Sequence, residues 1–243
     1  KPTHSETCCE YCGRPLAPCV VEFGGRRIVA GFRECDCEGA RRQKARVEKA
    51  EAAKREARLS ESRKRAGIPK RFLNATVQHQ SLLDYLESFE GSAGQGLYIY
   101  GSVGRGKSYS AAALANAFVD AGYRTVFTTA SAMLERIKAS FSGRGETETV
   151  VSRYTACDVL VIDDLGKEDA KEWSSNMMFL VINARYEGMR PTIFTSNYSI
   201  QALSKRLGRK GEVETAEAIA SRLSETTTPI YLTGPDMRIT SRS

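Results

Sequence analysis

The sequence predicts an α/β fold in which a parallel sheet is flanked by helices. Three observations predict it. A glycine-rich loop stands between a strand-like run and a helix-like run within residues 97–121. A second apolar run, at 157–162, is typical of a strand buried on both faces, and two aspartates follow it. Strand-like and helix-like segments then alternate as far as residue 233, which is the pattern of a parallel sheet with helical crossovers.

Length and composition set the outer limits of this prediction. The chain has 243 residues, of which 41% are hydrophobic, so it can bury one sizeable core and carry a small appendage. Its net charge of +7 favours an acidic partner such as nucleic acid. No apolar stretch approaches the length of a membrane span and no signal peptide is present. We therefore expect a cytoplasmic protein without a membrane partner, whose cysteines bind metal.

The first 40 residues are predicted to form a zinc-binding module. Six of the seven cysteines lie before residue 38. Cys9 and Cys12 form a C-x-x-C turn followed by glycine, and Cys35 and Cys37 supply a second pair. Because so short a segment buries little core, a tetrahedral zinc site would supply its folding energy. The rival ligands are Cys8, Cys19 and His4.

Between the cysteine pairs, residues 20–30 are β-prone and contain two adjacent glycines, which predicts a hairpin. Residues 41–66 consist mostly of strong helix formers with charges at i,i+4 spacing. We interpret them as a solvated spacer helix, with a basic helix facing nucleic acid as the alternative. The expected domains are a zinc module at 1–40, a helical linker at 41–66 and the α/β domain at 67–243.

After a predicted helix at 80–89, the strand-like run from residue 97 leads into a phosphate-binding loop. Residues 101–108 fit the pattern G-x-x-x-x-G-K-[ST], in which backbone N–H groups surround a triphosphate. Lys107 would reach the β- and γ-phosphates of ATP, and the Ser108 hydroxyl would bind Mg²⁺. The residues of this loop are Gly101, Ser102, Val103, Gly104, Arg105, Gly106, Lys107 and Ser108.

A helix at 109–121 and a strand at 124–129 are predicted next, followed by a helix at 131–140. This last helix leads into a loop that combines a basic side chain with an aromatic ring. Lys138, Phe141 and Arg144 could there bind single-stranded DNA through phosphate contact and base stacking. The alternative is that the ring of Phe141 belongs to the core.

The acid pair after the buried strand resembles a Walker B motif. Asp163 would hold Mg²⁺, and Asp164 would orient and activate the attacking water. Glu168 is the next candidate for the second role. A helix at 173–186 and a strand at 191–196 follow, and Asn197 comes directly after that strand. Because the carboxyl ends of parallel strands face the ligand, Asn197 could touch the γ-phosphate or its water.

Two short helices, at 200–207 and 216–223, and a last strand at 229–233 complete the α/β pattern. The second of these helices carries Arg222, and Arg238 follows the strand.

Six motifs in this order resemble the DnaC/IstB-type AAA+ ATPases. They are GIPKRF from residue 67, GSVGRGKS, VLVIDDLGKE, TIFTSN, AIASRLSE and LTGPDMR. The resemblance covers roughly residues 67–240. It implies a RecA-like AAA+ core without a C-terminal lid domain, and ATP hydrolysis linked to assembly on single-stranded DNA.

By position in these motifs, Asn197 resembles the sensor-1 residue and Arg222 the arginine finger that reaches a neighbouring subunit's ATP. Arg238 resembles a further phosphate-facing arginine, and residues 68–72 resemble the segment flanking the adenine. The chain departs from the pattern twice. Arg105 stands where such loops often have a small hydroxyl residue, and Asp164 stands where many AAA+ proteins have glutamate.

Within this family, an N-terminal module joined by a linker is more similar to the DnaC-type helicase loaders than to the IstB-type transposition helpers. The resemblance thus implies a helicase loader that uses ATP, Mg²⁺ and Zn²⁺. Its N-terminal module would hold the replicative helicase, and its ATPase domain would form a helical oligomer on single-stranded DNA. The alternatives are an IstB-like transposition helper and a zinc-dependent DNA-binding regulator that uses ATP as a switch.

Overall fold

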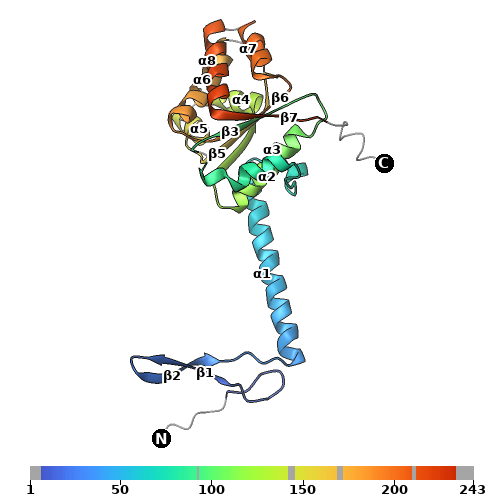
Figure 1. Ribbon diagram of the computed structural model, residues 1–243, viewed down its shortest axis with the longest axis vertical. Coiled ribbons are helices and arrows are strands. Elements are labelled where there is room, and N and C mark those ends of the chain that lie inside the picture. The colour runs from blue at the N-terminus through green and yellow to red at the C-terminus, as the bar shows by residue number, and fades with distance from the viewer. Residues whose placement is uncertain (1–6, 92, 142–145, 169–171, 210–211, 234–243) are drawn as a thin grey trace, which may run out of the picture. The chain divides into compact units, whose positions relative to one another are not determined.

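Five parallel strands form the central sheet of the larger part of the chain (Figure 1). The structure is a computed structural model and describes residues 7–91, 93–141, 146–168, 172–209 and 212–233. The strand order is β4-β5-β6-β3-β7. The strands are β3 (Gly96–Tyr100), β4 (Thr125–Thr129), β5 (Val159–Leu165), β6 (Thr192–Ser196) and β7 (Thr227–Tyr231).

The order of the strands reverses direction at β3. This strand pairs with β6 on one side and β7 on the other, whereas β4, the next strand in sequence, lies at the far edge of the sheet. The chain thus passes from β3 to the far edge at β4, returns through β5 and β6, and then adds β7 on the opposite side of β3. In open parallel sheets, ligands bind at the carboxyl end of the strands at such a point.

Helices cover the two faces of this sheet. Figure 1 shows α2 and α3 on one side of the strands and α4, α6 and α8 on the other. The helices here are α2 (Gln80–Glu87), α3 (Lys107–Asp120), α4 (Ala130–Ser140), α5 (Glu146–Thr155), α6 (Glu172–Glu187), α7 (Ile200–Gly208) and α8 (Val213–Thr226). Two single 3₁₀ turns, η1 (Lys70–Phe72) and η2 (Phe89–Gly91), flank α2.

Each face of the sheet has its own hydrophobic core, because successive side chains of a strand point to opposite faces. In β3, Leu97 and Ile99 pack with α3 residues such as Phe118. Tyr98 lies between them in sequence and joins the cluster on the other face, together with Phe194 of β6. Strands that are apolar on both faces are what the continuous apolar runs of the sequence predict.

The predicted fold class is confirmed: the chain folds as a parallel sheet flanked by helices, with the strands where the sequence places them. Helix α5 forms where the sequence predicts no element, at residues 147–155. Its sequence, ETETVVSRYT, contains three threonines and two valines, which are weak helix formers. Packing against α4 and α6, which both contact α5, outweighs this propensity.

The chain divides into two compact units, Lys1–Arg58 and Leu59–Ser243. In the first unit, β1 (Pro18–Phe23) and β2 (Arg26–Phe32) form an antiparallel hairpin that turns at the two glycines. Its apolar side chains are exposed; Phe23, for example, is 78% accessible. Among the described residues of this unit, Cys9 alone is buried.

Helix α1 (Glu38–Arg65) begins in the first unit and ends in the second, and it buries none of its residues. It therefore carries no apolar stripe for packing against another element. Within the second unit its end is fixed by Arg63, which binds both carboxylate oxygens of Asp120 at 2.9 and 2.6 Å. Among the described helices, none is long and apolar enough to span a lipid bilayer.

Candidate functional site

The loop between β3 and α3 is built to surround an anion. Gly104 and Gly106 have φ values of +83° and +77°, a conformation that side chains with a Cβ rarely adopt. Gly106 is also the N-cap of α3, and no side chain of the described residues caps this helix. The first N–H groups of α3 therefore point into the loop, where the helix dipole favours negative charge.

The lysine of this loop is buried within it. Lys107 is 6% exposed, and its Nζ donates to the carbonyls of Gly101 and Ser102 at 2.9 and 2.7 Å. Both acceptors are carbonyls of the loop. The ammonium group therefore lies inside the loop, where the phosphates of a nucleotide would bind. The loop therefore fits a triphosphate in geometry and in charge.

The predicted Mg²⁺ ligands lie together at the carboxyl edge of the sheet. The Ser108 hydroxyl donates to Asp163 Oδ1 at 3.0 Å, which joins the start of α3 to the end of β5. Hydroxyl and carboxylate oxygens are ligands that Mg²⁺ prefers. Burial raises the pKa of Asp163, and the hydrogen bonds from Thr195 and Ser108 oppose this effect. The donor set therefore fits a magnesium ion.

A β-bulge places the two acids at the same edge. Ile162 pairs with Phe194 and Leu165 pairs with Ser196, so Asp163 and Asp164 together stand opposite one residue of β6. Asp164 has a φ of +60°. Its carboxylate is 32% exposed and contacts Lys167 Nζ at 2.7 Å. It is thus accessible to water, as its predicted role requires, although that role stays a prediction.

The turn after the acids is held by side chains from elsewhere in the unit. Ser196 Oγ donates to the Leu165 carbonyl at 2.7 Å, and Arg206 Nε on α7 donates to the carbonyl of Gly166. The Gly166 amide donates to Glu168 Oε2 at 2.9 Å. Burial raises the pKa of Glu168, and among the described residues its Oε1 has no partner. Because Glu168 is 7% exposed, Asp164 is better placed to meet a water.

Asn197 and Arg222 occupy different surroundings. Asn197 comes directly after Ser196, which pairs with Leu165, and therefore lies at the edge of the sheet that carries the acids. Its side chain is half-buried. The Arg222 Nε on α8 donates to Asn183 Oδ1 at 2.6 Å, and its guanidinium stacks over the ring of Phe179 at 4.7 Å. These two partners belong to α6, and the guanidinium also donates to the Ala218 carbonyl on α8 itself. Arg238 lies outside the described residues.

The segment expected to flank the adenine packs beside the phosphate loop. The ring of Phe72 meets that of Tyr109 edge-on, with centroids 6.0 Å apart, and Arg71 stacks on Phe72 at 4.4 Å. Asn116 of α3 donates to the carbonyls of Phe72 and Ala75, both at 2.9 Å. These contacts attach residues 70–75 to the helix that starts at the loop.

The predicted DNA contacts are placed in part. Lys138 is exposed on α4. Phe141 is 56% exposed and contacts Trp173 edge-on, with ring centroids 6.1 Å apart. The ring is therefore accessible for stacking rather than part of the core. Arg144 lies outside the described residues.

In the first unit, four thiols converge at the base of the hairpin. The Sγ atoms of Cys9, Cys12, Cys35 and Cys37 all lie within 4.8 Å of one another. Cys9 and Cys37 are 3.8 Å apart, and Cys12 and Cys35 are 3.6 Å apart. Zn–S bonds of about 2.3 Å in a tetrahedron place neighbouring sulfurs about 3.8 Å apart, whereas a disulfide needs about 2 Å. The cluster therefore fits a Zn–S₄ centre.

Backbone amides support the charge of this cluster. The Ala40 amide, in the first turn of α1, donates to Cys37 Sγ at 3.4 Å. Hydrogen bonds from Arg14 lower the pKa of Cys12, which favours the thiolate that a metal binds, whereas burial and the neighbouring thiols raise the pKa of Cys35. Of the rival ligands, Cys8 and Cys19 are not part of the cluster. His4 lies outside the described residues.

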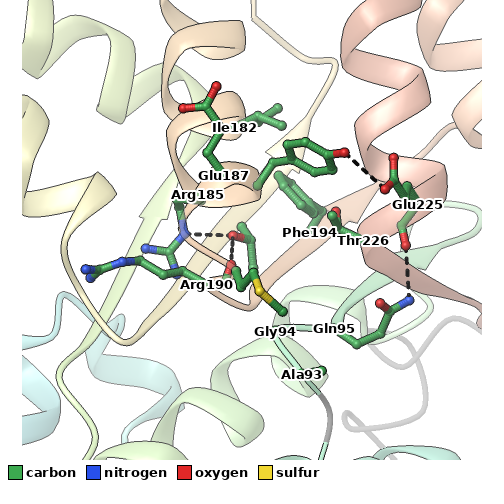
Figure 2. A pocket seen from close by; sticks show the side chains of 13 residues that line it. Ala93, Gly94, Gln95, Ile182, Arg185, Glu187, Arg190, Phe194, Glu225 and Thr226 are labelled. Atoms are coloured by element: carbon green, nitrogen blue, oxygen red, sulfur yellow. Dashed lines mark hydrogen bonds between the residues drawn. The ribbon is translucent and has the colours of Figure 1, made fainter.

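A cavity of about 350 Å³ lies at the opposite, amino edge of the sheet. Figure 2 shows it between the start of β3, the end of α6 and the end of α8. The Tyr186 hydroxyl donates to Glu225 Oε1 at 3.0 Å, and Arg185 Nε donates to Thr192 Oγ1 at 2.7 Å (Figure 2). These polar side chains bind one another, and so we assign no ligand to this cavity.

The sequence did not predict a role for two residues of the site. Thr195 bridges the two acids, and Arg206 binds the turn that follows them. A threonine within an apolar strand is typical of β-structure and does not indicate a functional role. An arginine on an amphipathic helix is usually a solvent-exposed surface residue. Only the pairing register and the packing of α7 bring these two residues to the acids.

The phosphate loop, the hydroxyl–carboxylate pair and the sheet order together define a P-loop nucleotide-binding protein with a RecA-like AAA+ core. Residues 36–243 match the family described as IstB-like ATP binding protein. The chain belongs to this family, which confirms the resemblance found in its motifs.

Curated relatives include helicase loaders and proteins of insertion sequences. The replicative helicase loader DnaI of Bacillus subtilis is 30% identical over 158 residues, or 64% of this chain and 50% of DnaI. The replicative helicase loader DnaC of Escherichia coli is 25% identical over 52% of this chain and 51% of DnaC. An ATP-binding protein in an insertion sequence of Mycobacterium tuberculosis is 28% identical over 60% of this chain and 57% of that protein. The chain therefore spans about half the length of these relatives.

Solved structures support the same fold. The crystal structure of the DnaC helicase loader aligns with a TM-score of 0.58 and 26% identity, covering 68% of this chain and all of that one. DnaI aligns with a TM-score of 0.56 and 26% identity, covering 68% of this chain and 94% of that one. DnaA from Aquifex aeolicus, at 21% identity and a TM-score of 0.54, shares the fold.

Proposed function

We propose that this chain is an ATP-hydrolysing loader of a replicative DNA helicase that acts in the cytoplasm. Residues 67–243 would bind ATP and Mg²⁺, assemble as a helical oligomer on single-stranded DNA and hydrolyse ATP. Residues 1–40 would hold zinc and contact the helicase, and residues 41–66 would link the two. The ATP-hydrolysing part of the proposal is supported by the 3.0 Å contact of Ser108 with Asp163 beside an accessible second acid. The helicase-loading part is supported by the similarity to the loaders DnaI and DnaC.

The chemistry assigned to each residue follows from its position. Lys107 and the amides at the start of α3 would bind the phosphates, and Ser108 and Asp163 would hold Mg²⁺, which neutralises charge on them. Asp164 would accept a proton from the attacking water. Asn197 would contact the γ-phosphate, and Arg222 would act on the nucleotide of a neighbouring subunit. Lys138, Phe141 and Arg144 are the proposed contacts to single-stranded DNA.

Helicase loading is tested with the full chain and purified partners. We expect it to co-elute with the replicative helicase of its own source, and single-stranded DNA to stimulate its ATP turnover. The Lys107→Ala variant should still bind the helicase but bind ATP about 10- to 100-fold more weakly, because a hydrogen bond to a charged group contributes about 1.5–3 kcal/mol.

The rival function has support from the relatives in insertion sequences, and the same experiment separates the two. The transposase of a neighbouring insertion sequence replaces the helicase in a parallel run. Co-elution with the transposase and not with the helicase would make the chain a transposition helper. ATP affinity unchanged by Lys107→Ala would contradict the assignment of the phosphate loop.

The zinc site gives a separate prediction. Elemental analysis of the purified chain should find about one zinc per molecule, bound by Cys9, Cys12, Cys35 and Cys37. The Cys12→Ser variant should lose it, because three thiolates leave the tetrahedral site incomplete. Cys8→Ser is the matched control, since Cys8 neighbours the cluster without belonging to it. Zinc retained by Cys12→Ser, or lost from Cys8→Ser, would refute this ligand set.

A further inference from the structure

The acid pair depends on an irregularity of the sheet that needs support. Asp163 and Asp164 of β5 stand opposite Thr195 of β6, two residues against one. Such bulges are rare between parallel strands and are found next to active sites, where they redirect side chains. In a regular strand, successive side chains point to opposite faces, so only one of the two acids could face the nucleotide edge.

The bulge has an energetic cost. Asp164 adopts a φ of +60°, which is unfavourable by about 1 kcal/mol or more for a residue with a Cβ. Parallel strands satisfy their backbone groups through evenly spaced hydrogen bonds, and an extra residue interrupts that pattern. The amide of Asp164 therefore needs an acceptor other than the backbone of β6.

The side chain of Thr195 supplies that acceptor and a donor as well. Its Oγ1 accepts a hydrogen bond from the Asp164 amide at 2.9 Å. The same hydroxyl donates to Asp163 Oδ1, the oxygen that also receives the bond from Ser108. Thr195 is fully buried, so water cannot replace it in either bond. One hydroxyl thus fixes the backbone of one acid and the carboxylate of the other.

We propose that Thr195 is a positioning residue for ATP hydrolysis: its hydroxyl holds the β-bulge so that Asp163 faces the metal position while Asp164 faces the attacking water. This inference rests on the proposed ATPase function and assigns a role at that site to a residue that touches neither nucleotide nor metal. Its effect should therefore appear in the rate of the chemical step rather than in nucleotide affinity, because Lys107 and the loop amides bind the phosphates independently of the bulge.

The test replaces the hydroxyl at constant shape. Thr195→Val keeps the β-branched side chain and removes both hydrogen bonds. We expect kcat to fall about 100-fold, the scale that a displacement of about 1 Å at a reacting group produces. The Kd for ATP should stay within about threefold of wild type. Thr195→Ser keeps the hydroxyl and should restore most of kcat, and Thr195→Cys, a weak donor, should lie between serine and valine.

Thr192→Val is the matched control in the same strand. Thr192 is also buried, but its hydroxyl accepts from Arg185 at the other end of β6. The Thr192→Val variant should have a lower thermal unfolding midpoint than the wild-type chain and a kcat near that of wild type. A purely structural role for Thr195 predicts the same pattern for Thr195→Val. Turnover of Thr195→Val within about twofold of wild type, or of Thr195→Ser no better than valine, overturns this inference alone. A wild-type chain without ATP turnover overturns the proposed function and this inference with it.

Discussion

Replacing Asp164 with asparagine is expected to leave ATP binding close to that of the wild-type chain and to lower hydrolysis about 10²- to 10⁴-fold, the usual contribution of a general base. Asparagine is the informative substitution for a structural reason. It tolerates the left-handed φ of +60° better than most residues and keeps the amide that binds Thr195. The bulge, Asp163 and its contact with Ser108 should therefore persist while the proton acceptor is lost.

Two further variants separate the carboxylate from its neighbours. Lys167→Met breaks the 2.7 Å ion pair with Asp164 but keeps the acid, so its turnover should stay near wild type. Glu168→Gln tests the other candidate base. ATP turnover is measured for each variant, with nucleotide affinity measured in parallel. Normal hydrolysis by Asp164→Asn, with loss in Glu168→Gln, would move the water-activating role to Glu168.

A second large effect is expected at Arg222. Its replacement by alanine should leave ATP affinity nearly intact and lower turnover by about 10³-fold or more, the range for an arginine that stabilises the transition state from a neighbouring subunit. Activity of the wild-type chain should rise with protein concentration, because the complete site forms only in the assembly. The measurement is turnover per chain over a concentration series.

Mixing variants tests whether Arg222 acts between subunits. Chains with Arg222→Ala keep an intact ATP loop, and chains with Lys107→Ala keep an intact arginine. At an ATP concentration near the wild-type Kd, each should show little turnover alone, and the mixture should recover part of the activity, since intact loops can then face intact arginines. Absence of recovery, together with turnover that does not depend on concentration, would refute the assembly-dependent mechanism.

The surroundings of Arg222 supply the matched control. Its guanidinium bonds Asn183 at 2.6 Å, whereas the nearby Glu225 bonds Tyr186. Asn183→Ala removes one intramolecular partner of Arg222 and leaves the guanidinium stacked on Phe179. If Arg222 acts on a neighbouring nucleotide, Asn183→Ala should retain most of the turnover. If Arg222 only ties α8 to α6, both variants should lose stability and neither should show recovery on mixing.

Parts of the structure whose chemistry is local in the sequence could be predicted. Residues 101–108 carry their spacing within one loop, and the apolar run before Asp163 identifies a buried strand. Spacing identified the pairs Cys9/Cys12 and Cys35/Cys37, because a turn after C-x-x-C brings two thiols together, but only the structure places Cys8 and Cys19 outside the cluster. In each case the partners are neighbours along the chain or share a known pattern.

The parts that could not be predicted depend on register and packing. Thr195 meets Asp164 because an extra residue in β5 shifts the pairing by one, and no residue type marks that shift. Arg206 reaches Gly166 through the docking of α7, 40 residues further along the chain. Helix α5 forms against its own weak propensity. These features arise from the tertiary structure, which a reading of single segments does not contain.

Because the hairpin of the first unit is exposed, the stability of this unit depends more on the zinc and proton concentrations of the solution than on its own packing. A two-stranded sheet with accessible apolar side chains is at best marginally stable in water. If the four thiols hold zinc as proposed, each tenfold rise in free zinc above the dissociation constant adds about 1.4 kcal/mol to the folding free energy of this unit. Acid works in the opposite direction, because protons compete with the metal for the thiolates. The first unit would then fold and unfold with the metal and proton activity of its surroundings, while the second unit keeps its two cores unchanged.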